Sequence, residues 1–219
     1  MRPLVIFGTG GFAEIAKYYF ERDSTYSVVG FTVDATYVVE ATFQGLPVVA
    51  FEELKASFPP DQAEMFVAMG IQKVNQIRAA KVAEAEARGY RLASYLSSRA
   101  RVPDDLVLQS NTFIMEEVGL QANVTVGRNS VLWPRTGVGF RSRIGDHCWL
   151  VTATLGESVT VGDYSFIGLN ATISSHVAIA PSNVIGAGAL ILEDTKEASV
   201  YKGHASERSR VPSRRLFRI

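Results

Sequence analysis

Aliphatic residues recur every six positions through the second half of the chain. The series starts at Val102, slips by one residue at Leu155, and resumes from Val161 to Ile191. A period of six fits neither an α-helix, with 3.6 residues per turn, nor an alternating strand, with a repeat of two. It predicts a triangular coil, in which each hexad supplies one short strand and one corner and three hexads complete a turn. The aliphatic positions are Val102, Leu108, Ile114, Leu120, Val126, Leu132, Val138, Ile144, Leu150, Leu155, Val161, Ile167, Ile173, Ile179, Ile185 and Ile191.

Small and turn-forming residues follow the aliphatic positions, as in Val126–Ser130 and Val161–Ser165. Gly, Asn and Asp tolerate the left-handed backbone that a tight corner needs. An ordinary β-sandwich is the alternative, but its strands are spaced irregularly at about 8–12 residues. The regular period therefore favours an all-β solenoid of hexapeptide repeats over residues 98–200.

The first part of the chain has a different pattern. A continuous apolar run at residues 4–7 precedes a glycine turn, and residues 12–21 have helical periodicity. Further strands are expected at 26–32, 48–50, 65–70 and 92–96, and further helices at 52–58 and 75–88. Strand–helix alternation predicts an α/β domain with a parallel sheet in residues 1–97. Residues 201–219 are expected to form a C-terminal tail.

Composition narrows the class of protein. The 219 residues are 47% hydrophobic and have zero formal net charge, which argues against a nucleic-acid-binding protein. With Cys148 as the single cysteine, no internal disulfide can form. No apolar stretch approaches the roughly 18 residues of a membrane span, and the N-terminus lacks the pattern of a signal peptide. We therefore expect a cytoplasmic protein without a membrane span.

The glycine turn Gly8, Thr9, Gly10 and Gly11 is a candidate binding site. Glycines let backbone N–H groups approach a phosphate or ribose at a helix N-terminus, where the dipole favours negative charge. Asp34 follows the second strand, where a ribose-binding acid belongs in dinucleotide sites. Because the sheet is too short for two nucleotide halves, we expect a site for one nucleotide. The alternative is that the glycines only close a tight strand–helix turn.

An α/β domain with a glycine turn, followed by a hexapeptide coil, resembles the sialic acid O-acetyltransferase-like sugar acyltransferases. This family includes bacillosamine and perosamine N-acetyltransferases, and the resemblance covers nearly the whole chain. The matching segments are residues 6–11, 30–34, 67–70 with Arg78, 144–147, 161–168, 185–189 and 200–205. In the last segment His204 stands where the family usually has proline.

The resemblance implies a Rossmann-like half domain followed by a left-handed parallel β-helix. It also implies a homotrimer in which acetyl-CoA, the co-substrate, lies between two coils. The acetyl group would pass to an amine or hydroxyl of a nucleotide-linked sugar, in surface-polysaccharide synthesis. By matching, Gly8–Gly11 and Asp34 would hold the nucleotide sugar. The coenzyme channel would be lined by main-chain groups near Gly168, Asn170, Gly186 and Gly188.

The general base of these enzymes is usually a histidine four residues before the Ile-Gly of one coil. Here the matching position is Phe140, or Arg141 if the register slips. Neither side chain accepts a proton at neutral pH. A hydroxyl acceptor needs such a base, whereas a sugar amine must only be oriented and lose one proton. Candidates for orienting an amine are Asp146, Asp163 and Glu157.

Three histidines are available. His147 lies nearest in sequence to the expected site and adjoins Asp146, so these two are the candidate catalytic residues. The alternative is that His147 is a solvent-exposed corner residue. His176 and His204 are further candidates, because a histidine pKa lies near neutrality. Zinc would need three or four ligands, so His147 and Cys148 do not indicate a metal site.

Arginines and aromatic residues gather on consecutive coils. Arg135, Arg141 and Arg143, with Trp133 and Phe140, could hold the phosphates of a nucleotide cofactor or form a subunit contact. The arginines of the tail could neutralise coenzyme phosphates across the trimer. The alternative is a solvated terminal segment with Leu216, Phe217 and Ile219 packed on a neighbour.

Two other functions are open. With the usual base absent, the chain could be a catalytically silent relative that binds nucleotide sugar or coenzyme as a scaffold. An oxidoreductase is disfavoured because no second domain is present to bring a substrate to a nicotinamide.

Overall fold

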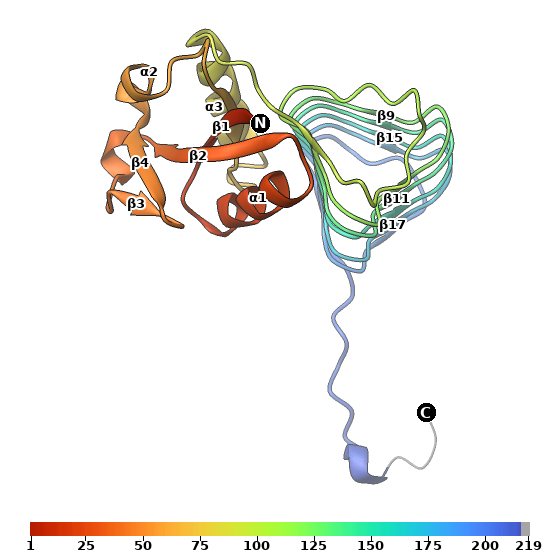
Figure 1. The fold of residues 1–219 in the computed structure, drawn as a ribbon. Coiled ribbons are helices and arrows are strands. Elements are labelled where there is room, and N and C mark those ends of the chain that lie inside the picture. Colours follow the sequence, from red (N-terminus) through yellow and green to blue (C-terminus); the bar gives the residue numbers. More distant parts are fainter. Residues whose placement is uncertain (216–219) are drawn as a thin grey trace.

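The computed structural model describes residues 1–215 (Figure 1), and its first domain is built around the continuous apolar run of the sequence. That run lies in β1 (Arg2–Phe7), which pairs in parallel with β2 (Tyr26–Val33) and β5 (Glu64–Val67). The sheet order is β3-β4-β2-β1-β5, and only β3 is antiparallel to its neighbour. The remaining elements are α1 (Gly11–Arg22), η1 (Ala35–Tyr37), β3 (Thr42–Phe43), β4 (Leu46–Ala50), η2 (Phe51–Glu53), α2 (Leu54–Ser57) and α3 (Gln76–Ala87).

Both faces of this sheet are buried, which explains why β1 is apolar throughout. Leu4 and Ile6 pack in one hydrophobic cluster with α1, whereas Val5 and Phe7 pack in another with α3. Alternate residues of a strand point to opposite faces, so a strand covered on both sides needs an apolar residue at every position. The predicted α/β sheet is thus confirmed.

The six-residue repeat forms a coil of two-residue strands. Its strands are β6 (Tyr95–Leu96), β7 (Phe113–Ile114), β8 (Gly119–Leu120), β9 (Thr125–Val126), β10 (Val131–Leu132), β11 (Gly137–Val138), β12 (Arg143–Ile144), β13 (Trp149–Leu150), β14 (Thr154–Leu155), β15 (Thr160–Val161), β16 (Phe166–Ile167), β17 (Thr172–Ile173), β18 (Ala178–Ile179), β19 (Val184–Ile185), β20 (Leu190–Ile191) and β21 (Val200–Tyr201). They stack in parallel as three sheets, one per face of the prism. From β7 to β20 the aliphatic residue ends each strand and is buried inside.

The predicted slip in the repeat is also observed. Leu132 lies opposite Leu150, but Val138 lies opposite Leu155, one residue earlier than an unbroken period would give. The start of the coil is less regular than expected. Val102 and Leu108 form no strand and only pack against the coil interior, because residues 102–110 close its open end as a loop.

Three corners separate the sheets, and each is a ladder of residues with positive φ between 46° and 66°. Corner A consists of Asn111, Asn129, His147, Tyr164 and Ser182. Corner B consists of Glu117, Arg135, Thr152, Asn170 and Gly188. Corner C consists of Asn123, Arg141, Ser158 and His176. We call each turn of the coil a rung. The expectation that corners need Gly, Asn or Asp is too narrow, because hydrogen bonds between successive rungs hold larger residues in this conformation.

The expected strand at 92–96 is divided between the two sheet systems. Leu92 bridges Met65 beside the first sheet, whereas Tyr95 and Leu96 pair with β7 of the coil. One hydrophobic cluster contains residues of both parts, including Phe20 of α1 and Trp149 of the coil. The first domain therefore packs directly against one face of the coil and shares a hydrophobic core with it (Figure 1).

Beyond β21 the chain leaves the coil in an extended path, which ends in η3 (Ser213–Arg215) (Figure 1). Arg208, Arg210, Arg214 and Arg215 are exposed there. The apolar positions Leu216, Phe217 and Ile219 lie outside the described residues. None of the described helices is long and apolar enough to cross a membrane.

Candidate functional site

The glycine turn joins β1 to α1 at the carboxyl edge of the parallel sheet. Gly8 has φ of 122°, and a Cβ there would lie 2.8 Å from the Ala68 carbonyl oxygen, so the backbone requires glycine. Gly10 caps α1 without a side-chain hydrogen bond, and a Cβ on Gly10 or Gly11 would meet open space. The N-terminus of α1 therefore has space for an anionic ligand, and the binding of such a ligand stays a prediction.

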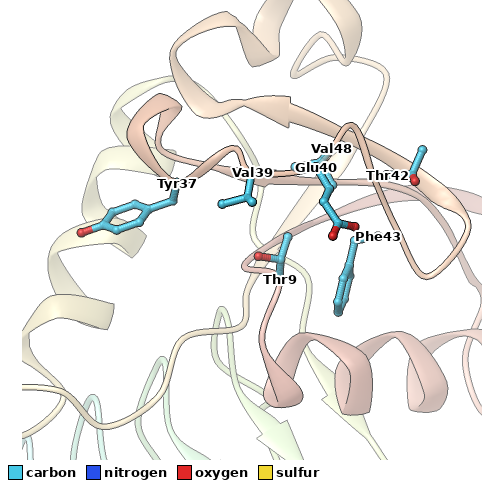
Figure 2. Close-up of a pocket in the computed structure, with 7 residues that line it drawn as sticks. All are labelled: Thr9, Tyr37, Val39, Glu40, Thr42, Phe43 and Val48. Atoms are coloured by element: carbon cyan, nitrogen blue, oxygen red, sulfur yellow. The ribbon is translucent and has the colours of Figure 1, made fainter.

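A cavity of about 330 Å³ opens beside this turn (Figure 2). Its lining residues are Thr9, Tyr37, Val39, Glu40, Thr42, Phe43 and Val48. They come from the glycine turn, the segment after β2, and the β3–β4 hairpin, and Figure 2 shows Thr9, Glu40 and Phe43 around a common space. Tyr37 is 69% exposed at the rim, so an aromatic face is available for stacking. Ligands of open α/β sheets bind at this edge of the strands.

Asp34 lies at the same edge but does not line the cavity. Its Oδ1 accepts a hydrogen bond from Lys81 Nζ at 2.6 Å, and Lys81 also donates to Glu84. Burial alone would lower the pKa of Lys81, but hydrogen bonds to both carboxylates outweigh it and raise the pKa above its usual value. The Lys81 ammonium also lies over the rings of Phe7 and Phe51. Asp34 is thus partly engaged by a cation of α3.

Arg78 of α3 joins the first domain to corner A. The side chain is fully buried, and its Nε donates to Asn129 Oδ1 at 3.0 Å. Its Nη groups donate to Asn75 Oδ1 and to the carbonyl oxygens of Asn129 and His147. The guanidinium also lies 5.1 Å from the ring centroid of Trp149. Burial lowers the Arg78 pKa to about 10, which still leaves it charged at neutral pH.

Sequence reasoning used Arg78 only as part of a family match and assigned it no role. A charged residue near the start of a predicted helix is normally expected to be exposed to solvent, and nothing in the neighbouring sequence indicates that Arg78 is buried. The partners that bury Arg78 lie far along the chain, at Asn129 and His147.

The proton of His147 can be located from its neighbours. Asn111 Oδ1 accepts from the Val67 N–H, so Asn111 Nδ2 must be the donor to Asn129 Oδ1 at 2.8 Å. Asn129 Nδ2 is then the donor to His147 Nδ1, also at 2.8 Å. The neutral ring therefore carries its proton on Nε2, and burial lowers its pKa, which favours this neutral form.

In this arrangement Nε2 of His147 is a hydrogen-bond donor, and the lone pair on Nδ1 already accepts from Asn129. A general base needs an unoccupied lone pair that can reach the proton it removes. The ring also stacks on Tyr164, with centroids 4.8 Å apart. The geometry favours a structural role for His147, and its catalytic role stays a prediction.

The Asp146 carboxylate is hydrogen-bonded to the backbone of the coil. Its Oδ1 accepts from the Arg128 N–H at 2.9 Å, and its own N–H donates to Asp163 Oδ1 at 2.8 Å. Each acid thus satisfies an N–H group of the preceding rung. Such contacts match the alternative that these acids serve the corners, while a role in orienting an amine is untested.

Corner C carries Phe140, the position at which the sequence resemblance predicts the general base. Phe140 lies next to corner residue Arg141, whose guanidinium is 4.8 Å from the Phe140 ring centroid. The Ser158 N–H donates to the Phe140 carbonyl, and the His176 N–H donates to the Glu157 carbonyl. Glu157 and His176 therefore stack on successive rungs above Phe140.

His176 and Glu157 also approach each other through their side chains. His176 Nε2 lies 3.5 Å from Glu157 Oε1, and the two side chains are 70% and 55% exposed. His147 is closer to Phe140 along the chain but belongs to another corner. Phe140 therefore lies beside the corner that contains His176 and not beside the corner that contains His147, because residues one turn of the coil apart share a corner.

The four expected coenzyme-binding residues lie together. Asn170 and Gly188 are successive members of corner B, and the Gly188 N–H donates to the Leu169 carbonyl at 2.8 Å. Gly168 and Gly186 precede them on the same two rungs. A Cβ on Gly168 would lie 2.8 Å from the Ala187 nitrogen, whereas one on Gly188 would meet open space. Packing alone therefore accounts for Gly168, and Gly188 leaves room at the surface.

Cys148 and the acids near it form no metal site. Within residues 1–215, no group of three or more His, Cys, Asp or Glu side chains could hold a metal ion. Cys148 is fully buried, and burial raises its pKa to about 12. Such a thiol is inert as a nucleophile.

Comparison with known proteins finds proteins similar to both parts of the chain. Residues 3–84 match the family described as the PglD N-terminal domain. The bifunctional protein GlmU of Clostridium beijerinckii is 24% identical over 154 residues, covering 52% of this chain and 33% of that protein. The chain thus spans about a third of the length of this curated relative.

Two solved structures resemble nearly the whole chain. A histidine-to-asparagine variant of perosamine N-acetyltransferase from Caulobacter crescentus, in complex with CoA and GDP-perosamine, has a TM-score of 0.82 at 22% identity. The match covers 93% of this chain and 94% of that one. The acetyltransferase domain of PglB from Neisseria gonorrhoeae FA1090, in complex with acetyl coenzyme A, has a TM-score of 0.63 at 22% identity and covers 92% and 96%.

At these identities the solved structures establish the fold. The predicted combination of a Rossmann-like half domain and a left-handed parallel β-helix is confirmed. The resemblance to the sugar acyltransferases, made on sequence motifs, is confirmed as well.

Proposed function

We propose that this chain, whose first domain matches the PglD N-terminal domain family, is an acetyl-CoA-dependent sugar acyltransferase. It transfers an acetyl group to an amino or hydroxy group of a nucleotide-linked sugar. The observation that carries the proposal is the cavity beside the glycine turn, in a fold shared along its length with an N-acetyltransferase bound to CoA and GDP-perosamine. A homotrimer, a cytoplasmic location and a role in surface-polysaccharide synthesis are parts of the same proposal.

The nucleotide of the sugar binds at the glycine turn. The uncapped N-terminus of α1 faces the phosphates, and the open space at Gly10 and Gly11 admits them. Tyr37 and Phe43 at the cavity offer aromatic faces to the base. Asp34, held by Lys81, remains the candidate for the ribose. Acetyl-CoA is proposed to lie along corner B, near Asn170 and Gly188.

The reaction itself makes one bond and breaks one. The amine nitrogen of the sugar attacks the thioester carbonyl, the C–S bond breaks, and the amine gives up one proton as the coenzyme thiol leaves. Phe140 stands where the usual base is expected and cannot take that proton. An amine acceptor is favoured because its orientation supplies much of the rate by proximity.

His176 is a better candidate for accepting the proton than the sequence suggests. It is exposed, it shares corner C with Phe140, and Glu157 lies 3.5 Å from its Nε2. A carboxylate in that position would orient the ring. His147 and Asp146 remain the alternative pair, although their polar atoms are engaged by corner A.

The experiment that tests the function is thiol release from acetyl-CoA. It is run with UDP-, GDP- and dTDP-linked 3-amino and 4-amino sugars, with the matching hydroxy sugars as controls. Release with one amino sugar supports an N-acyltransferase that works without a histidine at position 140. Release with a hydroxy sugar instead would assign an O-acyltransferase.

The silent-relative alternative rests on Phe140. If calorimetry shows binding of nucleotide sugar or coenzyme while thiol release is absent for every sugar, the scaffold function is preferred and catalysis is rejected.

A further inference from the structure

A second cavity, of about 470 Å³, lies on the first rungs of the coil. Its lining residues are Arg99, Arg101, Glu117, Gly119, Arg135, Thr136 and Gly137. None of them lines the cavity beside the glycine turn. Three of the seven are arginines and two are strand glycines, a composition that the proposed function leaves unexplained.

The two glycines are not required by the backbone. Gly119 of β8 and Gly137 of β11 are paired with each other, and neither has a positive φ. A Cβ on either would meet nothing within 4 Å. The next rungs of the same sheet carry Thr154 and Thr172 at this position, so larger residues are tolerated there.

Glycine weakens a strand, and inside a strand it often marks the close approach of a ligand. Leu120 and Val138, which follow these glycines, are buried inside the coil. Strand residues alternate in direction, so the glycines face outward. They leave an open floor to the cavity.

Arginines surround that floor. Arg101 bridges Gly119 and therefore lies one rung before it, while Arg135 belongs to corner B. The Arg99 carbonyl accepts from the Glu117 N–H, which places Arg99 on the same corner as Glu117 and Arg135. Stacked strands are about 4.8 Å apart, so the three arginines span about 10 Å along the coil.

The positive charge of this cavity is only partly compensated. Arg99 lies 3.9 Å from Glu116, but that carboxylate already accepts the Tyr19 hydroxyl at 2.5 Å. Within residues 1–215, no ion pair involves Arg101 or Arg135. Glu117 is the one acid among the lining residues. An anion that binds here would meet unpaired guanidinium groups.

We propose that this cavity binds a phosphate-bearing ligand of diphosphate size. Guanidinium groups match phosphate oxygens with paired hydrogen bonds, and the glycine floor lets the ligand contact the strand backbone. The site lies on the first turns of corner B and is distinct from the nucleotide site proposed at the glycine turn. Acetyl-CoA is proposed to lie along later turns of the same corner, so a coenzyme ligand at this cavity rests on the proposed function. Its ligand is either a nucleoside diphosphate or the diphosphate of a coenzyme.

Calorimetry tests this site with inorganic pyrophosphate as the first probe. Arg135→Gln is expected to weaken pyrophosphate binding about tenfold or more, because one charge-assisted contact is lost. Arg141→Gln is the matched control, since Arg141 is also an exposed corner arginine, with φ of 58° against 61° for Arg135. The control should bind like the parent protein.

A second pair of variants tests the glycine floor. Gly137→Val places a side chain on the open floor, where a Cβ meets nothing within 4 Å, and should abolish pyrophosphate binding while the melting temperature is kept. Thr154→Val, one rung on, should have no effect on binding. The inference is contradicted if Gly137→Val and Thr154→Val both lose pyrophosphate binding, or if neither does.

The source of the phosphate is distinguished by repeating the titrations with GDP and with CoA. The ligand whose affinity falls in both Arg135→Gln and Gly137→Val is the natural class. If Gly137→Val alters the size of the assembly in sedimentation but leaves anion binding unchanged, the glycines serve a contact between chains and the inference is wrong. Because binding is measured without turnover, this result is independent of the thiol-release assay.

Discussion

Corners A and C of the coil are built from the same repeat but differ in role: corner A packs against the first domain, and corner C presents side chains to solvent. Corner A lies against α3, and its side chains form a continuous hydrogen-bonded ladder from Val67 through Asn111 and Asn129 to His147. Corner C faces away from the first domain, and its members Arg141, Ser158 and His176 have no such ladder among the described residues. The same left-handed corner conformation is thus used once to join two domains and once to present side chains.

The difference shows how burial changes the chemistry of a residue type. His147 and His176 have nearly the same backbone, with φ of 60° and 65°. In His147 one ring nitrogen is occupied and the pKa is lowered by burial, whereas the His176 side chain is 70% exposed beside a carboxylate. A histidine becomes a candidate base through its surroundings, not through its proximity in sequence to an expected site.

The largest expected effect comes from breaking corner A at Arg78. Arg78→Met keeps much of the side-chain volume but removes the donor of several buried acceptors, including Asn75 Oδ1 and the Asn129 carbonyl oxygen. We expect a loss of about 3 kcal/mol in the free energy of unfolding. Urea denaturation measures it, and Arg141→Met at corner C should change stability by less than about 0.5 kcal/mol. Equal losses at both corners would contradict the comparison.

The next effect separates the two histidines in catalysis. If the proposed acyltransfer is confirmed, His176→Asn should lower kcat by about 100-fold, because the proposed proton acceptor is lost. Asparagine tolerates the left-handed backbone, so folding should be kept. His147→Asn is the matched control and should lower kcat far less. The opposite order would return the catalytic role to His147.

Glu157 provides a finer test of the same corner. Glu157→Gln keeps the shape of the side chain but removes the charge beside His176. We expect kcat to fall a few-fold, because His176 loses the carboxylate 3.5 Å from its Nε2 that would orient the ring. Steady-state kinetics of the variant and the parent protein with one amino sugar measure this change. An unchanged kcat would show that Glu157 does not position His176.

The smallest effect is a pH dependence of stability at corner A. The pKa of His147 is lower in the folded protein than its ordinary value of 6.5, so the unfolded chain binds the proton more readily. Stability from this residue is complete above pH 6.5 and is lost as pH falls through the folded pKa. Urea denaturation between pH 7.5 and 5 should show a weaker decline in His147→Asn. A decline as steep in His147→Asn as in the parent protein would contradict this assignment.

The coil could be predicted from the sequence, because each hexad repeats the same pattern of one aliphatic residue followed by corner residues. The inward aliphatic residue and the corner residue depend on near neighbours, so even the slip at Leu155 could be located. The glycine turn at Gly8–Gly11 was equally predictable, since a strand, a turn and a helix are adjacent in the chain. Its cavity was not, because Tyr37 and Phe43 reach it from other segments.

Tertiary structure alone decided which residues share a corner, and so which histidine lies above Phe140. It also moved Tyr95 and Leu96 into the coil, buried Arg78, and brought Arg101 and Arg135 around two glycines. The physical reason is the range of the interactions. Periodicity is set by neighbouring residues, whereas a buried charge or a shared cavity depends on partners that only the folded coil brings together.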